Sequence, residues 1–159
     1  MKNRVVVTGM GAITPLGNSV DAFWDNIRKG HCGIDLITRF DAQAFDVRIA
    51  AEVRDFDPQN YMDKREARRM DRFTQYALAA SRMAADQAAL DVSKVNPERF
   101  GVIMGTGIGG IETLEDQANV INTKGPGRVS PFFVPMMIGN MAAGQISIAF
   151  GAKGINTTI

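Results

Sequence analysis

Glycines at two places in the chain have a spacing that is typical of phosphate-binding turns. Residues 100–110 read FGVIMGTGIGG, in which Gly105, Gly107 and Gly110 match the pattern G-x-G-x-x-G directly after a short apolar run. In dinucleotide-binding proteins such glycines let backbone amides approach a pyrophosphate after a strand. Residues 4–17, RVVVTGMGAITPLG, nearly repeat the pattern. The chemistry therefore depends on whether these glycines bind a nucleotide or have another purpose.

The sequence around both segments argues against a nucleotide. A dinucleotide fingerprint expects an acidic residue roughly 20 positions after the glycines, but that stretch here is KGPGRVSPF, without Asp or Glu. In the N-terminal segment Thr14 replaces the third glycine and Pro15 follows it, where a helix should continue. We keep a dinucleotide-binding module as an alternative and favour glycines that let the backbone pass close to another surface.

His31 and Cys32 are the only histidine and the only cysteine, and they are neighbours in the segment GHCGI. A metal site would need further ligands, and a Cys–His catalytic pair needs side chains that face each other across space. We therefore expect both residues to be structural, with no metal and no cofactor. A single cysteine also excludes an intrachain disulfide framework and is typical of a reducing compartment.

The composition favours a cytoplasmic α/β protein. The 159 residues include 22% charged residues and carry a net charge of +1, so no global field points to nucleic acid or to an anionic membrane. No run of about 18 apolar residues predicts a membrane span, and the early strand-like segment from Arg4 leaves no room for a signal peptide.

Strands and helices are expected to alternate, which favours a mostly parallel sheet. We expect strands at residues 4–8, 99–104 and 154–159, and helices over 19–29, 63–90, 111–121 and 134–150. Residues 34–61 are irregular, with at most a short strand in IAAEV. Because no crossover helix follows the last strand, we expect the chain to be the first part of a larger domain.

A cluster of cations is expected on the first turns of the helix at 63–90. It comprises Lys64, Arg65, Arg68, Arg69 and Arg72. Cations at a helix N-terminus are unfavourable by roughly 0.3–1 kcal/mol each, so we favour an anionic partner, for which acidic helices of a small protein qualify as well as phosphate. A solvated helix start is the alternative, because Asp63, Glu66 and Asp71 offset part of the charge.

The predicted helix at 134–150 is apolar on every side except at Asn140, Gln145 and Ser147. Such a helix is buried, either in a core or in a subunit interface. Small residues between Gly139 and Gly144 permit another backbone to approach, which fits an interface across a symmetry axis.

Taken in order, these blocks resemble the N-terminal part of the elongating β-ketoacyl-acyl carrier protein synthases (type II) of the thiolase superfamily. The resemblance is carried by RVVVTGMGAITPLG, FWDNIRKGHCGI, DKREARRMDRFTQYAL, GTGIGG and SPFFVPMMIGNMAAGQISIAFG. GTGIGG alone is a weak signal, but its combination with SPFFVP and N-M-A-A-G is highly specific. The resemblance covers nearly the whole chain.

The resemblance implies a thiolase-like α/β fold, layered α-β-α-β-α in the intact homodimer, of which residues 1–159 form the N-terminal part of the first half, incomplete at its C-terminal end. The implied reaction is a decarboxylative Claisen condensation of an acyl-enzyme with malonyl-carrier protein. The nucleophilic cysteine resembles a T-A-C-[AS] continuation expected after Ile159, and two histidines lie further on. The segment thus has no catalytic residue of its own and alone is expected to be inactive, and Cys32 does not match the nucleophile's motif.

The resemblance also implies binding residues. Ile108 matches a position that gates the acyl pocket, and Phe133, Val134 and Ile138 match residues that line the partner's acyl tunnel across the dimer. Lys64, Arg65, Arg68 and Arg69 match a patch that docks the acidic acyl carrier protein, to which Arg128 contributes. The implied partners are this carrier, acyl- and malonyl-thioesters, and a second copy of the chain.

Two further alternatives stay open. A non-catalytic partner like the chain-length factors of aromatic polyketide synthases keeps the fold and lacks the cysteine. A polyketide ketosynthase is possible within the enzyme class. The residues after Ile159 distinguish enzyme from partner, because Thr-Ala-Cys indicates the former and Gln in place of Cys the latter.

Overall fold

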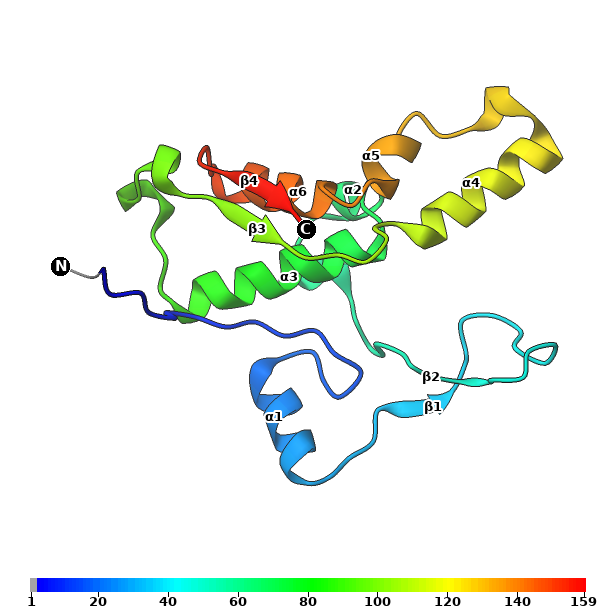
Figure 1. The fold of residues 1–159 in the computed structure, drawn as a ribbon, viewed down its shortest axis with the longest axis horizontal. Coiled ribbons are helices and arrows are strands. Elements are labelled where there is room, and N and C mark those ends of the chain that lie inside the picture. Colours follow the sequence, from blue (N-terminus) through cyan, green and yellow to red (C-terminus); the bar gives the residue numbers. More distant parts are fainter. Residues whose placement is uncertain (1–2) are drawn as a thin grey trace.

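The computed structural model describes residues 3–159 and shows a mixed α/β arrangement (Figure 1). The helices and strands are α1 (Val20–Arg28), β1 (Ile34–Leu36), β2 (Ile49–Ala51), α2 (Lys64–Ala67), α3 (Arg72–Gln87), β3 (Val102–Met104), α4 (Ile111–Lys124), α5 (Phe133–Met137), α6 (Met141–Phe150) and β4 (Asn156–Thr158). Single 3-10 turns are η1 (Pro58–Asn60), η2 (Val92–Lys94), η3 (Pro97–Arg99) and η4 (Pro126–Arg128).

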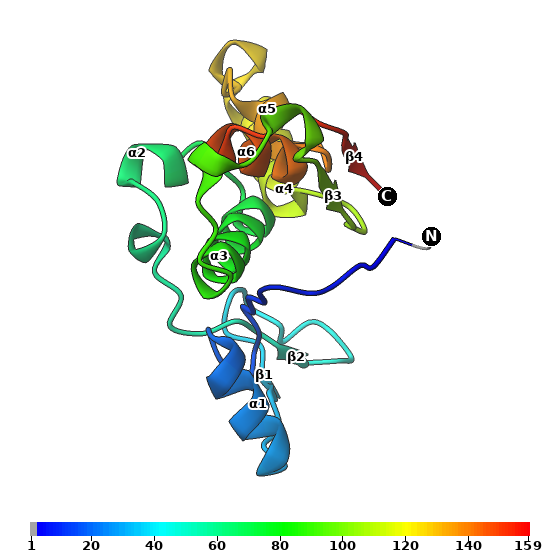
Figure 2. The same cartoon turned by 90° about the vertical axis from the view of Figure 1, so that its left-hand side faces the viewer.

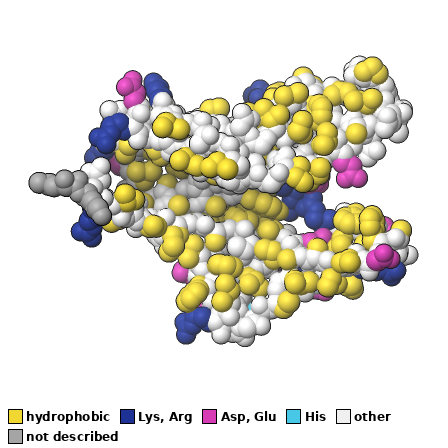
Figure 3. Space-filling model, viewed as in Figure 1, with side chains coloured by type: hydrophobic (Ala, Val, Ile, Leu, Met, Phe, Trp, Pro, Cys, Tyr) yellow, Lys and Arg dark blue, Asp and Glu magenta, His cyan; other side chains and the backbone are white. Residues whose placement is uncertain are grey.

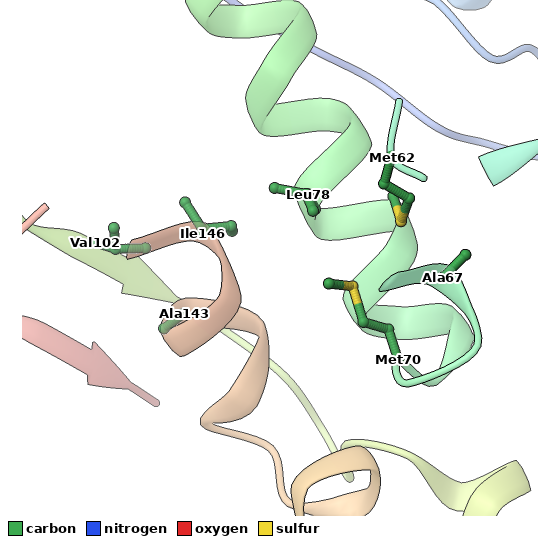
Figure 4. Close-up of a cluster of buried hydrophobic side chains, with 7 residues drawn as sticks. All are labelled: Met62, Ala67, Met70, Leu78, Val102, Ala143 and Ile146. Carbon is green, nitrogen blue, oxygen red and sulfur yellow. The ribbon is translucent and has the colours of Figure 1, made fainter. Parts of the chain in front are cut away.

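Helix α3 lies at the centre of the molecule. It packs against α6, and α6 in turn contacts strands β3 and β4. Helix α1 and the β1–β2 hairpin lie on the other side of α3, so that two parts are visible in both views (Figures 1 and 2). The buried apolar cluster is contributed by α2 and its flanks, α3, β3 and α6 (Figure 4): Met62, Ala67, Met70, Leu78, Val102, Ala143 and Ile146.

The two short sheets differ in direction. Strands β3 and β4 are parallel, with Val102 opposite Asn156 and Met104 opposite Thr158, which confirms the expected parallel pairing for this part of the chain. Strands β1 and β2 are antiparallel, with Ile34 opposite Ala51. The sequence pattern indicates only the second of these strands, because β1 is three residues long, too short for its alternation of apolar and polar residues to stand out.

The expected strand at residues 4–8 is wrong for this structure. These residues belong to no strand and pair with none among residues 3–159. Val5 and Val7 are 90% and 82% exposed, and Figure 3 shows hydrophobic side chains spread over this face of the molecule. A β-branched run favours extended backbone, but a strand exists only when a neighbouring backbone supplies the ladder of hydrogen bonds.

The expected helix at 63–90 is two helices, because Asp71 begins a new one. The Asp71 side chain accepts a hydrogen bond from the amide of Phe73 as the N-cap of α3, and Asp63 caps α2 in the same way. The side-chain amide of Gln75 donates through Nε2 to the carbonyl oxygens of Ala67 and Met70. These bonds satisfy backbone groups that the break would otherwise leave unpaired.

The expected helix at 134–150 is also interrupted. Helix α5 ends at Met137, and Ile138 has an extended backbone with ψ 137°. The Met137 carbonyl accepts a hydrogen bond from the amide of Gly110 at 2.8 Å. The helix restarts at Met141, whose amide donates to the Ile138 carbonyl at 3.2 Å. The other expected helices are confirmed, with Gly30 left-handed after α1 at φ 70° and Gly151 after α6 at φ 66°.

Candidate functional site

The N-terminal glycines lie against the backbone of α3. A Cβ atom on Gly9 would stand 2.0 Å from the Ala84 carbonyl oxygen, and one on Gly11 would stand 1.9 Å from that of Ala80. The Met10 amide donates to the side-chain oxygen of Gln87 at 2.7 Å. This segment therefore uses glycine for close backbone approach, as the favoured interpretation predicts, and its backbone contacts a helix of the same chain.

The second glycine segment forms a turn between β3 and α4, which we call the glycine turn (residues 105–110). Gly109 has φ 84°, and a Cβ there would lie 2.5 Å from the Met137 carbonyl oxygen. The Gly109 amide donates to Oγ1 of Thr106 at 3.2 Å, and the Gly110 amide donates to Met137. Because both amides already have acceptors within the protein, they do not form a free phosphate cradle.

The glycine turn presents Ile108 to the outside. This side chain is 67% exposed, although isoleucine is among the most often buried residues. The predicted tunnel residues lie on or just after α5: Val134 is 54% exposed, Phe133 is half-buried, and so is Ile138. Contacts of Gly109 with Met137 bring the turn and the end of α5 together, so the structure places the predicted acyl-binding residues on two adjoining segments.

The parallel strands place the glycine turn at a sheet edge. The Ile159 amide donates to the Met104 carbonyl at 2.9 Å, and the Thr106 amide donates to the Ile159 carbonyl at 3.0 Å. Ile159, the residue that follows β4, therefore lies beside the start of the glycine turn. Ligands of open α/β sheets bind at this edge, outside the carboxyl ends of the strands.

Two hollows open elsewhere on the surface. A polar hollow of about 660 Å³ lies between the hairpin segment and α3, with Arg39, Glu52 and Arg72 in its lining. The Thr38 hydroxyl holds the pKa of Glu52 below its ordinary value by hydrogen bonding. An apolar hollow of about 330 Å³ lies between Thr8, α3, β3 and α6. Neither hollow is lined by the predicted acyl-binding residues.

The predicted docking cations surround a very short helix. Lys64 and Arg65 lie on α2, and Arg68 and Arg69 follow its last residue. All four are exposed and form no ion pair within residues 3–159. The argument from a helix N-terminus is therefore wrong for Arg68 and Arg69, because the chain leaves α2 before them. Lys64 and Arg65, the first residues of α2, and Arg72, the first residue of α3, stay at such an end.

Arg69 also contacts the segment that leads into α5. Its guanidinium lies 4.7 Å from the centre of the Phe132 ring, a cation–π contact. Arg128 lies on η4 beyond the end of α4, apart from α2 in both views (Figures 1 and 2). The structure therefore groups four of the five predicted docking residues and leaves Arg128 on a separate segment.

Asp71 is a functional candidate that sequence reasoning missed. Its carboxylate is buried, with the residue only 8% exposed, and Oδ2 accepts hydrogen bonds from Oγ1 of Thr113 at 2.6 Å and from the Thr113 amide at 3.0 Å. The available signal was an aspartate before a helical stretch, which predicts an N-cap. Its second partner lies 42 positions away, and no local pattern indicates it.

The lone histidine and the lone cysteine lie at the surface, after the end of α1. Cys32 is exposed and lies beside His31 in a turn after α1. Residues 3–159 contain no cluster of three or more His, Cys, Asp or Glu side chains that could hold a metal ion. Within the same residues, every helix is too short or too polar to cross a bilayer.

The model of the family described as β-ketoacyl synthase, N-terminal domain, matches residues 2–159. The chain belongs to this family. Among curated β-ketoacyl synthases, the 3-oxoacyl-[acyl-carrier-protein] synthase 2 of Staphylococcus aureus (strain COL) is 54% identical over 96% of the chain. The protein of the same name from Synechocystis sp. (strain PCC 6803) is 50% identical over 98% of it. In both cases the chain spans only 37% of the relative's length.

Solved ketosynthase structures show the same thiolase-like α/β fold. The ishigamide ketosynthase/chain length factor is 30% identical, with a TM-score of 0.86 over 97% of this chain and 39% of that one. A chain in the structure of a type II polyketide synthase acyl-carrier protein in complex with its ketosynthase is 28% identical to this one. Its TM-score is 0.81 over 99% of this chain and 41% of that chain. The expected fold class is confirmed.

Proposed function

We propose that this chain is the N-terminal part of the first thiolase-like half of a 3-oxoacyl-[acyl-carrier-protein] synthase of type II. The observation that carries the proposal is 54% identity over 96% of the chain to a synthase 2. Because the aligned part is 96% of the chain, it includes the glycine turn, α2 and α5. The chain covers 37% of such a relative, so the activity belongs to the longer protein.

The proposed reaction has two stages. An acyl group moves from its carrier to a cysteine thiolate after Ile159, and the carrier leaves as its own thiolate. Malonyl-carrier protein then loses carbon dioxide, and the resulting carbanion attacks the acyl-cysteine thioester, which forms the new carbon–carbon bond and releases the thiolate. Two histidines further along the chain stabilise the thioester oxyanion and assist decarboxylation. A catalytic thiol must stay reduced, which is consistent with a cytoplasmic enzyme.

The position of the glycine turn supports this assignment. Because Ile159 hydrogen bonds to Met104 and Thr106, a cysteine a few residues beyond it would emerge at the sheet edge where the turn begins. In this proposal Ile108 would close the acyl pocket beside the nucleophile. An acyl chain needs a narrow pocket with apolar walls. The glycine turn and α5 both expose apolar side chains, Ile108 and Val134.

The homodimer is part of the same proposal. Phe133, Val134 and Ile138 would line the acyl tunnel of the partner protomer. They occupy a short helix and the residue after it, and their apolar side chains are incompletely covered within this chain. Insertion between protomers would remove this surface from water, at roughly 25 cal/mol per Å² of apolar area.

The exposed cations around α2 form the proposed carrier-docking surface. Lys64, Arg65, Arg68 and Arg69 carry no intramolecular ion pair in the described residues, and the methionines on either side of the segment anchor it in the core. A rigid, unpaired basic surface is suited to steering an acidic carrier. Arg128 would contribute from η4, as a second point of contact.

The central experiment is an assay of the full-length protein with acyl- and malonyl-carrier protein. We expect condensation, and we expect the cysteine of a Thr-Ala-Cys sequence after Ile159 to be essential, whereas Cys32→Ser retains activity. Residues 1–159 alone should give no product. Loss of activity only in Cys32→Ser, or no condensation by the intact protein, would reject the assignment.

A second experiment tests the docking surface. Charge reversal of Arg68 and Arg69 to Glu should raise the KM for the carrier by about tenfold at low salt, and the effect should shrink as salt screens the charges. Reversal of Arg28 and Lys29, an equally exposed adjacent pair at the end of α1, is the matched control. Equal effects of the two pairs would show that net charge, not the surface at α2, governs docking.

The non-catalytic partner remains the second candidate, because one similar structure is of a ketosynthase/chain length factor. A Gln in place of the cysteine after Ile159 would decide for it. In that case the protein would show no condensation alone and would form a complex with an active ketosynthase.

A further inference from the structure

Helix α4 lacks a cap of its own. Its N-cap residue is Gly110, which has no side chain to accept the free amides of the first turn. Such amides need an acceptor when they are buried. The Thr113 amide finds one in Oδ2 of Asp71 at 3.0 Å, and the Thr113 hydroxyl donates to the same oxygen at 2.6 Å.

The same carboxylate caps α3. Its other oxygen, Oδ1, accepts from the Phe73 amide at 3.4 Å. One buried carboxylate thus lies at the N-termini of two helices, where negative charge is stabilised by both dipoles. No cation pairs with Asp71 within residues 3–159, so backbone amides and one hydroxyl provide its electrostatic partners.

This carboxylate also lies directly against the last residue of the glycine turn. A Cβ atom on Gly110 would lie 2.8 Å from Oδ2 of Asp71 and 2.6 Å from the Met136 carbonyl oxygen. The last residue of the turn is therefore held between Asp71 and the end of α5. Ile108 stands only two positions earlier, on the exposed side of the turn.

We propose that Asp71 is a positioning residue that sets the acyl-chain-length preference, because it caps α4 from the neighbouring helix and holds the turn that carries Ile108. The inference rests on the proposed condensing activity. The charge-assisted hydrogen bonds from Thr113 hold the first turn of α4, directly after the glycine turn, on the Asp71 carboxylate and so keep Ile108 in one place. Without these bonds the turn yields more easily, and the pocket admits longer acyl chains.

The test uses Thr113 of the full-length enzyme, so that the capping carboxylate itself stays in place. Thr113→Val removes only the hydroxyl donor, and Thr113→Ser restores it. Thr14→Val is the matched control, because it removes a hydroxyl that donates to the Gly17 carbonyl at 3.0 Å in a different turn. The readout is the ratio of kcat/KM for a long-chain to that for a short-chain acyl-carrier protein.

We expect Thr113→Val to raise this ratio by about fivefold, since loss of a hydrogen bond to a charged group shifts an equilibrium by roughly tenfold or more. Thr113→Ser should keep the ratio of the unmodified enzyme. An unchanged ratio in Thr113→Val, or an equal rise in Thr14→Val, would overturn the proposal that the hydrogen bond between the Thr113 hydroxyl and Asp71 holds Ile108 in place. Absence of condensation by the unmodified protein would instead reject the proposed function, so the two failures are distinguishable.

Discussion

Two glycine segments with nearly the same pattern have different surroundings in this structure. Gly9 and Gly11 lie directly on the backbone of α3, where no side chain could fit. In the glycine turn Gly109 and Gly110 have close neighbours, whereas a Cβ atom on Gly107 would meet no other atom within 4 Å. The first segment holds the chain against its central helix. The second holds an exposed side chain at a sheet edge, so similar glycine spacing does not imply a similar function.

The largest effect is expected from Gly11→Ala. The new Cβ would stand 1.9 Å from the Ala80 carbonyl oxygen, and helix backbone cannot move away without losing its own hydrogen bonds. We expect a loss of about 3 kcal/mol or more of unfolding free energy in the full-length protein, measured as a large fall in Tm or as insoluble expression.

Gly30→Ala is the control for this prediction. Gly30 has φ 70° and no neighbour within 4 Å, so alanine there meets only the cost of a left-handed backbone, roughly 1–2 kcal/mol. If Gly11→Ala and Gly30→Ala lowered Tm equally, close packing of the N-terminal segment on α3 would be disproved.

An intermediate effect is expected from Gly109→Ala. Alanine there combines a left-handed backbone, at φ 84°, with a Cβ 2.5 Å from the Met137 carbonyl oxygen. We expect a loss of about 2 kcal/mol of unfolding free energy, less than at Gly11 because the turn lies at the surface and can shift. The shift should displace Ile108, so that the acyl-chain-length profile changes together with Tm.

Gly107→Ala is the matched control within the turn. Its position has free space and no left-handed backbone, so its free energy of unfolding should stay within about 0.5 kcal/mol of the unmodified protein. A large loss at Gly107 would mean that the whole turn, and not only its last two glycines, is packed.

The smallest effect on stability, with a clear effect on function, is expected from Ile108→Phe. The side chain is 67% exposed, so a larger ring should cost less than about 0.5 kcal/mol of unfolding free energy. It should occlude the acyl pocket and shorten the accepted chain, measured as product length with a series of acyl-carrier primers. Ile121→Phe on α4, also exposed, should leave the profile unchanged; an unaltered profile in Ile108→Phe would contradict the gate.

Local sequence patterns predicted where the helices lie, but they did not predict where two of these helices are interrupted. Helix α1 was predicted over 19–29 and spans Val20–Arg28, because its cap Ser19 and the left-handed Gly30 act within one turn of the residues they terminate. The long helices at 63–90 and 134–150 were each predicted without their break. At both interruptions a residue also bonds to a partner distant in sequence, which no local pattern indicates: Asp71 to Thr113, and Met137 to Gly110.

For the candidate site as well, the sequence named individual residues but not the contacts between them. Local sequence, through the family resemblance, named Ile108, the α5 residues and the basic cluster. It could not show that the glycine turn contacts the end of α5, or that Asp71 joins two helix N-termini. Such contacts depend on which surfaces meet after the chain folds, and the spacing of residues along the chain does not record them.

The sequence by itself determined the family, the short parallel strand pair and the need for glycine wherever backbones approach. Its residue types and order specify these features, because helix caps, apolar runs and glycine conformations act over a few residues. Only the tertiary structure decided which glycines pack and which present a side chain. Packing and buried hydrogen bonds join residues far apart along the chain, and a carboxylate such as Asp71 acquires its role from the helices that meet there.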